Sequence, residues 1–127
     1  AAQNSLMWQI FTDMQNTGIN EHSGSTKSEW YSRMKREFLV NIYERDDPNG
    51  YGVMMTSLRD IYRGGDKENS EIVHKHIVNE TSTRSATVAQ FAEFLGDIMR
   101  WCNARGISYR MPGDSYDLAM GIKQSAK

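Results

Sequence analysis

The stretch from Thr87 to Gly106, TVAQFAEFLGDIMRWCNARG, decides the fold of this chain. Thr87 and Gln90 have the spacing of a capping box, and Gly106 is suited to the position just after a helix. Between these signals, apolar residues recur at helical spacing and form one continuous stripe of Val88, Phe91, Leu95, Ile98, Met99 and Cys102. We therefore expect an amphipathic helix over this stretch.

Two further aromatic residues, Phe94 and Trp101, widen the apolar face of this expected helix. A small domain covers one stripe easily, whereas covering both flanks needs additional neighbours. Such a broad face is typical either of a central core helix or of a subunit interface. We predict that the chain self-associates, with Phe94 or Trp101 near the interface, and a purely internal core position is the alternative.

Other parts of the chain predict three more helices and one strand. Apolar residues share a helix face over residues 7–14, over residues 30–42 and over residues 54–62, and Thr26 with Glu29 forms a second capping box. Residues 71–79 (EIVHKHIVN) are rich in β-branched side chains with imperfect alternation, which favours a strand. The predicted fold is α+β and helix-dominated, with three to four amphipathic helices packed on a small sheet.

Length and charge restrict the classes of function. With 127 residues the chain is expected to form a single domain over residues 1–127. Fifteen Lys and Arg residues stand against sixteen Asp and Glu residues, so binding of a polyanion must rely on a local basic patch. The single cysteine, Cys102, excludes an internal disulfide and a multi-cysteine zinc site. No apolar run approaches the roughly 20 residues that span a bilayer, and we expect a cytoplasmic protein.

Basic residues gather on two of the expected helices and are the first candidate site. Arg33, Lys35 and Arg36 lie on one helix, and Arg59 and Arg63 lie one turn apart on the next. Phosphate contacts from such side chains supply sequence-independent affinity for nucleic acids. The alternative is an ordinary solvated helix flank with acidic neighbours.

Aromatic side chains are the second candidate, since rings serve as stacking platforms for single-stranded bases. Most of the rings fall on expected apolar faces and are better explained as core. Trp8 is the exception because it lies off its stripe, in a row with Asn4. We predict that Trp8 contacts DNA, and packing against a partner is the competing interpretation.

Two histidines and the cysteine complete the candidates. On a strand, His74 and His76 would point to one face, where they would begin a metal site for a nuclease. The carboxylates Glu71, Asp66 and Glu80 form no familiar ligand motif with them, so exposed strand histidines are the favoured interpretation. Cys102 lies on the apolar stripe, where a thiolate is costly, and is expected to be a core residue.

Two stretches together resemble the NinB family, also called Orf, of lambdoid phage recombination proteins. Residues 3–8 (QNSLMW) are similar to the family's QN-x-x-x-W helix start. Residues 82–107 contain STR, V, FAEFL and ARGI in the order of the family's STSR…V-x-x-FAE-x-L…ERG block. Glu29-Trp30 falls where the family has an acidic residue followed by Trp. The family's β-rich N-terminal region has no counterpart before Gln3, and residues 44–80 match poorly.

The resemblance implies a DNA-binding accessory protein of phage or prophage homologous recombination. Proteins of this family are homodimers that prefer single-stranded or gapped DNA, act beside the host single-strand DNA-binding protein and promote loading of the strand-annealing machinery. It also places Asn4 and Arg84 among the DNA-binding candidates, because they stand within the matching motifs. This recombination mediator would be non-catalytic and would need neither metal nor nucleotide cofactor. The alternatives are a metal-dependent nuclease using His74 and His76, and a helical adaptor that binds only protein.

Overall fold

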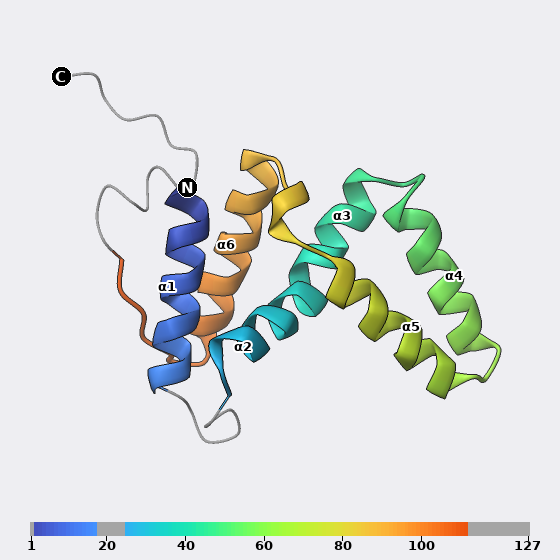
Figure 1. Cartoon of the computed structure of the whole chain (residues 1–127), viewed down its shortest axis with the longest axis horizontal. Helices are drawn as coiled ribbons and strands as arrows, with labels where there is room; N and C mark the ends of the chain where they lie inside the picture. The colour runs from blue at the N-terminus through green and yellow to red at the C-terminus, as the bar shows by residue number, and fades with distance from the viewer. Residues whose placement is uncertain (1, 18–24, 112–127) are drawn as a thin grey trace.

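The computed structural model describes residues 2–17 and 25–111, and helices account for most of them (Figure 1). The helices are α1 (Ala2–Thr17), α2 (Lys27–Met34), α3 (Val40–Asp46), α4 (Tyr51–Arg63), α5 (Lys67–Glu80) and α6 (Val88–Ala104). A π-helical turn, η2 (Lys35–Leu39), joins α2 to α3, and a 3₁₀ turn, η3 (Thr83–Ser85), precedes α6. None of the described residues is in a strand.

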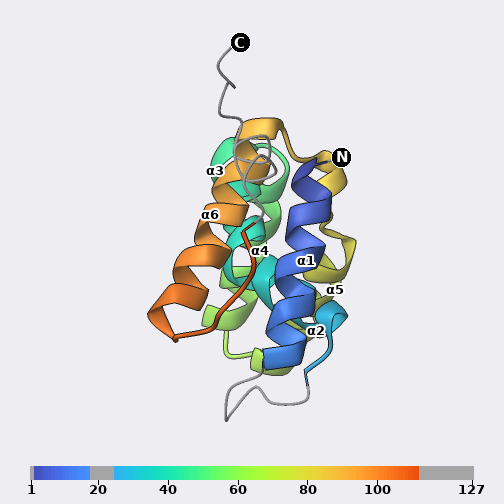
Figure 2. The same ribbon diagram turned by 90° about the vertical axis from the view of Figure 1, so that its left-hand side faces the viewer.

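The main core lies where α1, α2 and α6 meet, and α1 runs beside α6 (Figure 2). Ile10, Phe11 and Met14 of α1 and Phe94, Leu95 and Ile98 of α6 have no exposed surface. Each such side chain contributes roughly 1.5–3 kcal/mol on burial, so this cluster provides most of the driving force for folding. The apolar stripe expected over residues 7–14 is confirmed as core. The stripe expected over residues 87–105 is confirmed from Phe91 to Cys102, whereas Val88 at its start is 61% exposed.

A π-helical turn shifts the buried face of the second stripe. Met34 is fully buried, and the α-helical spacing expected over residues 30–42 placed Phe38 next to it. The π-helical turn adds one residue to that turn, so Leu39 takes the buried position and Phe38 remains half-exposed. The buried face then continues with Ile42 and Tyr43.

Helices α4 and α5 form a hairpin that extends away from α1 and α6 (Figure 1). The hairpin has a separate small core, in which Val40 of α3 packs with Met55, Leu58, Ile77 and Val78. Gly65, with φ of +92°, makes the turn between the two helices, a conformation that glycine adopts at little cost.

The predicted sheet is wrong, because residues 71–79 lie inside α5. The carboxylate of Asp66 accepts a hydrogen bond from the Asn69 amide at 3.1 Å and caps the helix, in a segment with the composition of a loop. Ser70, Ile77 and Val78 form the buried side of that helix. The β-branched content therefore reflects packing in the hairpin, which overrides strand propensity.

The two capping boxes predicted from the sequence are confirmed. Thr26 with Glu29 begins α2, and Thr87 with Gln90 begins α6. Gly106, with φ of +69°, follows the end of α6 as expected. Within the described part of the chain, no helix is both long enough and apolar enough to cross a membrane.

Candidate nucleic-acid interface

A groove between α2 and α5 gathers three basic side chains. Arg33 and Arg36 line one wall and Lys75 lines the other, with Val78 and Asn79 between them, around a volume of about 360 Å³. The three cations come from segments separated by about forty positions in the sequence, and the fold brings them to one surface. We call these three residues the α2–α5 basic groove.

Arg36, which lines this groove, forms an ion pair with Glu71. Arg36 donates two parallel hydrogen bonds of 2.7 Å to the carboxylate of Glu71 on α5. The pair lowers the pKa of Glu71 to about 2 and raises the pKa of Arg36, because each charge favours the ionised form of the other. Both side chains are close to half exposed, so the pair is accessible to solvent and to an incoming anion.

Arg33 and Lys75 carry the remaining charge of the groove. The Arg33 guanidinium lies over the rings of Trp30 and Trp101, at 5.8 Å and 5.2 Å from their centroids. These contacts with the two rings hold the guanidinium in place. Lys75 is exposed and lies one turn after Glu71 on α5. Among the described residues, Lys75 has no carboxylate within salt-bridge distance.

Lys35 is not part of this surface, because its side chain points into the protein. Only 6% of the residue is exposed, and its ammonium donates a 2.9 Å hydrogen bond to the carbonyl of Thr81. The same group lies 4.5 Å from the centroid of the Tyr31 ring. A buried ammonium with these partners holds η2 against the end of α5, so the prediction that Lys35 contacts DNA is withdrawn.

Arg59 and Arg63 line a second cavity, on the other side of α5, between α4 and α5. Arg59 pairs with Glu44 of α3 through contacts of 2.7 Å, which offset its charge. No ion pair of Arg63 is found within residues 2–17 and 25–111. The five basic residues predicted as one patch are therefore divided among a groove, a cavity and the interior.

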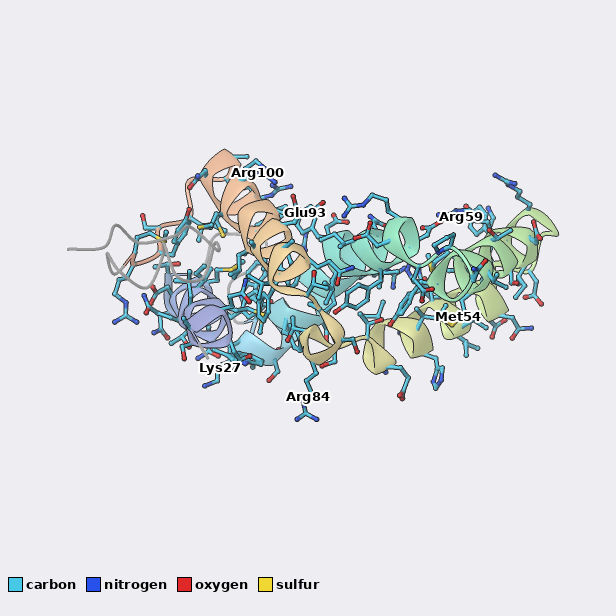
Figure 3. All side chains as sticks on the ribbon, turned by 90° about the horizontal axis from the view of Figure 1, so that it is seen from above. Lys27, Met54, Arg59, Arg84, Glu93 and Arg100 are labelled. Carbon is cyan, nitrogen blue, oxygen red and sulfur yellow. The ribbon has the colours of Figure 1, made fainter. Side chains whose placement is uncertain are left out.

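Arg84 projects from η3, and its side chain stands away from the body of the protein (Figure 3). The Ser82 side chain accepts a hydrogen bond from the Arg84 amide at 3.1 Å. The Tyr43 hydroxyl donates to the Ser82 carbonyl at 2.7 Å, and the Tyr31 hydroxyl accepts from the Thr83 amide at 3.2 Å. The segment is thus anchored on both sides, and the structure presents Arg84 on a fixed turn.

Trp8 and Asn4 lie on α1, away from the α2–α5 basic groove. The Trp8 ring is half-buried and packs edge-on against Phe11 at 5.7 Å and Tyr31 at 5.2 Å between centroids. These contacts match the packing interpretation more closely than a free stacking platform. Asn4 is exposed on the first turns of the same helix.

Phe94 and Trp101 are covered by the chain itself. Phe94 has no exposed surface and Trp101 is 6% exposed. The Trp101 ring packs against Trp30 at 5.4 Å, and the Arg105 guanidinium lies 3.9 Å from its centroid. The broad face of α6 is therefore satisfied within one chain, because both α1 and η2 pack against it. It no longer provides an argument for a dimer.

His74 and His76 do not share a face, since residues two apart on a helix diverge by about 200°. His74 lines the cavity between α4 and α5, and His76 is exposed. Burial and the neighbouring Arg36 lower the pKa of His74, while Glu71 acts in the opposite direction. Within the described residues, no three His, Cys, Asp or Glu side chains are placed to hold a metal ion.

Cys102 is buried without exposed surface in the main core. Burial raises the pKa of its thiol to about 11, although Arg105 acts to lower it. The side chain is therefore a protonated thiol at neutral pH.

Sequence reasoning missed Lys75, which completes the groove, and the role of Glu71 as the ion-pair partner of Arg36. On a strand, the four-residue spacing of Glu71 and Lys75 predicts no shared surface with the basic helix. On a helix the same spacing places both on one side of α5, facing α2. The combination of Asp66 and Asn69 was the signal for this helix.

Comparison of the chain with protein-family models, curated proteins and solved structures finds no match. The resemblance to the NinB family therefore stays a prediction based on residues 3–8 and 82–107.

Proposed function

We propose that this chain binds single-stranded or gapped DNA in the bacterial cytoplasm as a non-catalytic accessory protein of phage or prophage recombination. The motif resemblance provides the biological setting, including a host single-strand DNA-binding protein as partner. The α2–α5 basic groove provides the chemistry, since its cations suit the phosphates of a nucleic-acid backbone.

The observation that carries the proposal is the imbalance of charge around this groove. Three cations, Arg33, Arg36 and Lys75, line the groove, and none of its described lining residues is a carboxylate. In a chain whose formal net charge is −1, this concentration is local. An incoming phosphate has to compete with Glu71 for Arg36, whereas Lys75 interacts with the charge of Glu71 only at longer range.

The mode of recognition follows from which side chains are accessible. The rings best placed to stack on bases, Trp8 and Trp30, are half-buried and buried. Phosphate contacts therefore dominate the expected affinity, so binding should tolerate changes of base sequence and should weaken as salt is added. Arg84, presented on its own turn, is the expected second contact to the backbone.

The nuclease alternative loses the feature that suggested it, because His74 and His76 diverge on α5. The adaptor alternative retains one observation, the exposed apolar residues on the hairpin. Val53, Met54, Ile72 and Val73 are each at least 36% exposed. Since α6 is covered within the chain, a homodimer of the kind implied by the resemblance would have to use such a surface.

The experiment that tests this proposal is fluorescence anisotropy with labelled single-stranded, gapped and duplex DNA, at two salt concentrations and with or without EDTA. We expect binding that prefers the single-stranded and gapped forms, weakens with salt and is unaffected by EDTA, with no cleavage in Mg²⁺ or Mn²⁺. Absence of binding at low salt would reject DNA as the partner and favour the adaptor. Cleavage that EDTA abolishes would favour the nuclease.

A further inference from the structure

The cavity between α4 and α5 has features of a second binding site. It encloses about 380 Å³, which is at the small end of the roughly 300–1,000 Å³ typical of small-molecule sites. Met55 and Leu58 form its apolar floor, and Arg63, Ser70 and His74 are among its polar lining residues. A few convergent polar groups on an apolar wall are what fix the orientation of a small ligand.

Ser70 is the most informative of these residues. Only 6% of the residue is exposed, and it lines the cavity. Its hydroxyl makes no hydrogen bond to any described residue, and its oxygen keeps surface that opens into the cavity. This hydroxyl is therefore available to donate to, or accept from, a ligand in the cavity.

The charge around the cavity indicates an anion. Two carboxylates that pair with arginines beside the cavity are already engaged, Glu44 by Arg59 and Glu71 by Arg36. Arg63 keeps its charge uncompensated among the residues that the structure describes. His74 faces Arg36 of η2, Arg59 and Arg63 of α4 and Glu71 of its own helix, and its imidazole supplies one further N–H donor.

We propose that the cavity between α4 and α5 binds the phosphate monoester of a nucleotide, with Arg63, Ser70 and His74 as its polar contacts. A dianionic phosphate uses the charge of Arg63 and accepts hydrogen bonds from the hydroxyl and the imidazole. Tyr62, at 53% exposure on the rim, has the Lys67 ammonium 5.5 Å from its ring centroid and offers its remaining ring surface to the nucleoside portion. The ligand is a free mononucleotide or the phosphorylated end of a strand, since both present this chemistry.

This site shares no lining residue with the α2–α5 basic groove. The inference therefore does not depend on DNA binding by the groove. Substitutions at Arg33 or Lys75 should leave the cavity unaffected, so failure of one proposal is distinguishable from failure of the other.

The test is an NMR pH titration of the His74 ring in the full chain, with inorganic phosphate, dAMP or deoxyadenosine added. A bound dianion favours the imidazolium form, so phosphate and dAMP should raise the pKa of His74, whereas deoxyadenosine should leave it unchanged. The resonance is assigned with a His74→Gln variant. If millimolar dAMP does not move it, or deoxyadenosine moves it equally, the proposal is wrong.

Three variants make the test specific. Arg63→Gln should weaken dAMP binding at least tenfold, because a charge-assisted contact is lost. Ser70→Ala should weaken it several-fold and leave thermal stability unchanged, since the hydroxyl makes no hydrogen bond to any residue in the described ranges. Arg100→Gln on α6 is the matched control and should bind normally. Affinities that are the same in the Arg63, Ser70 and control variants would overturn the proposal.

Oligonucleotides with and without a 5′ phosphate separate the two sources of the ligand. If the phosphorylated strand moves the His74 resonance and the hydroxyl-ended strand does not, the ligand is a strand end. If dAMP alone moves it, the ligand is the free nucleotide, and either result supports the site. An equal shift by both strands would contradict recognition of a monoester.

Discussion

The guanidinium of Arg36 in η2 donates two parallel hydrogen bonds of 2.7 Å to the carboxylate of Glu71 in α5. This ion pair ties the α4–α5 hairpin to the helix that begins with α2. Arg36 lines the α2–α5 basic groove, and both charges of the pair act on His74, which lines the cavity between α4 and α5. The same guanidinium therefore stabilises the hairpin and faces the groove in which we propose that DNA binds.

The first prediction concerns acid. The pKa of Glu71 falls from its ordinary 4.5 to about 2 in the folded protein, because Arg36 stabilises the carboxylate. A depressed pKa contributes stability that is complete above the unfolded value and is lost as pH falls through the folded value. Chemical denaturation from pH 6 to pH 2 should therefore show this contribution disappearing between about pH 4.5 and pH 2.

Glu71→Gln provides the control for the acid prediction. The variant should be less stable than the parent at pH 6, and the difference should shrink toward pH 2. A difference that stays constant over this range would show that the ion pair does not determine the acid response.

The second prediction separates Lys35 from the groove. Lys35→Met keeps the length of the side chain and removes the ammonium that bonds to the Thr81 carbonyl. We expect a loss of about 1.5–3 kcal/mol in the free energy of unfolding, typical of a hydrogen bond to a charged group. At temperatures where the variant is folded, its DNA binding should keep the salt dependence of the parent. A flatter salt dependence would place Lys35 at the phosphates.

The third prediction concerns Trp101, which packs in the main core. Trp101→Ala should cost about 3–5 kcal/mol of folding stability, as expected when a large buried side chain is removed. Thermal melting measured by circular dichroism should show the loss at every protein concentration. If the variant instead keeps its melting temperature and only dissociates a dimer on ultracentrifugation, Trp101 is an interface residue.

The fourth prediction concerns Cys102, whose thiol is buried and has a pKa raised to about 11. Alkylation by iodoacetamide at pH 8 should be slow in the native protein, because little thiolate forms and little of it is accessible. Addition of denaturant should restore the rate of an ordinary cysteine. Rapid labelling of the native chain would contradict the core position.

The sequence predicts the parts of the fold in which local signals agree with packing. At α6, a capping box, an apolar stripe and a terminal glycine all indicate the same helix, and all three are present. At α5, β-branched residues favoured a strand, and only the Asp66 cap and the pairing with α4 indicate a helix. Phe38 and Leu39 exchange roles because of a π-helical turn, which no periodicity of 3.6 residues anticipates.

The candidate site was less predictable than the fold, for a physical reason. Sequence reasoning grouped Arg33, Lys35 and Arg36 because they are neighbours in the chain. On a helix, residues 33 and 35 point in different directions, and Lys35 enters the interior. Lys75, which completes the groove, comes from a helix that had been expected to be a strand.

The measurement that tests the central claim most directly is the salt dependence of single-stranded DNA binding by an Arg33→Gln/Arg36→Gln/Lys75→Gln variant. Each phosphate contact contributes about 0.7 to the slope of log K against log salt for single strands, so losing three should reduce its magnitude by about 2. An Arg100→Gln/Lys27→Gln variant is the control for lost charge, and its slope should match the parent's. If the groove variant keeps the parent's slope and affinity, DNA does not bind in the α2–α5 basic groove.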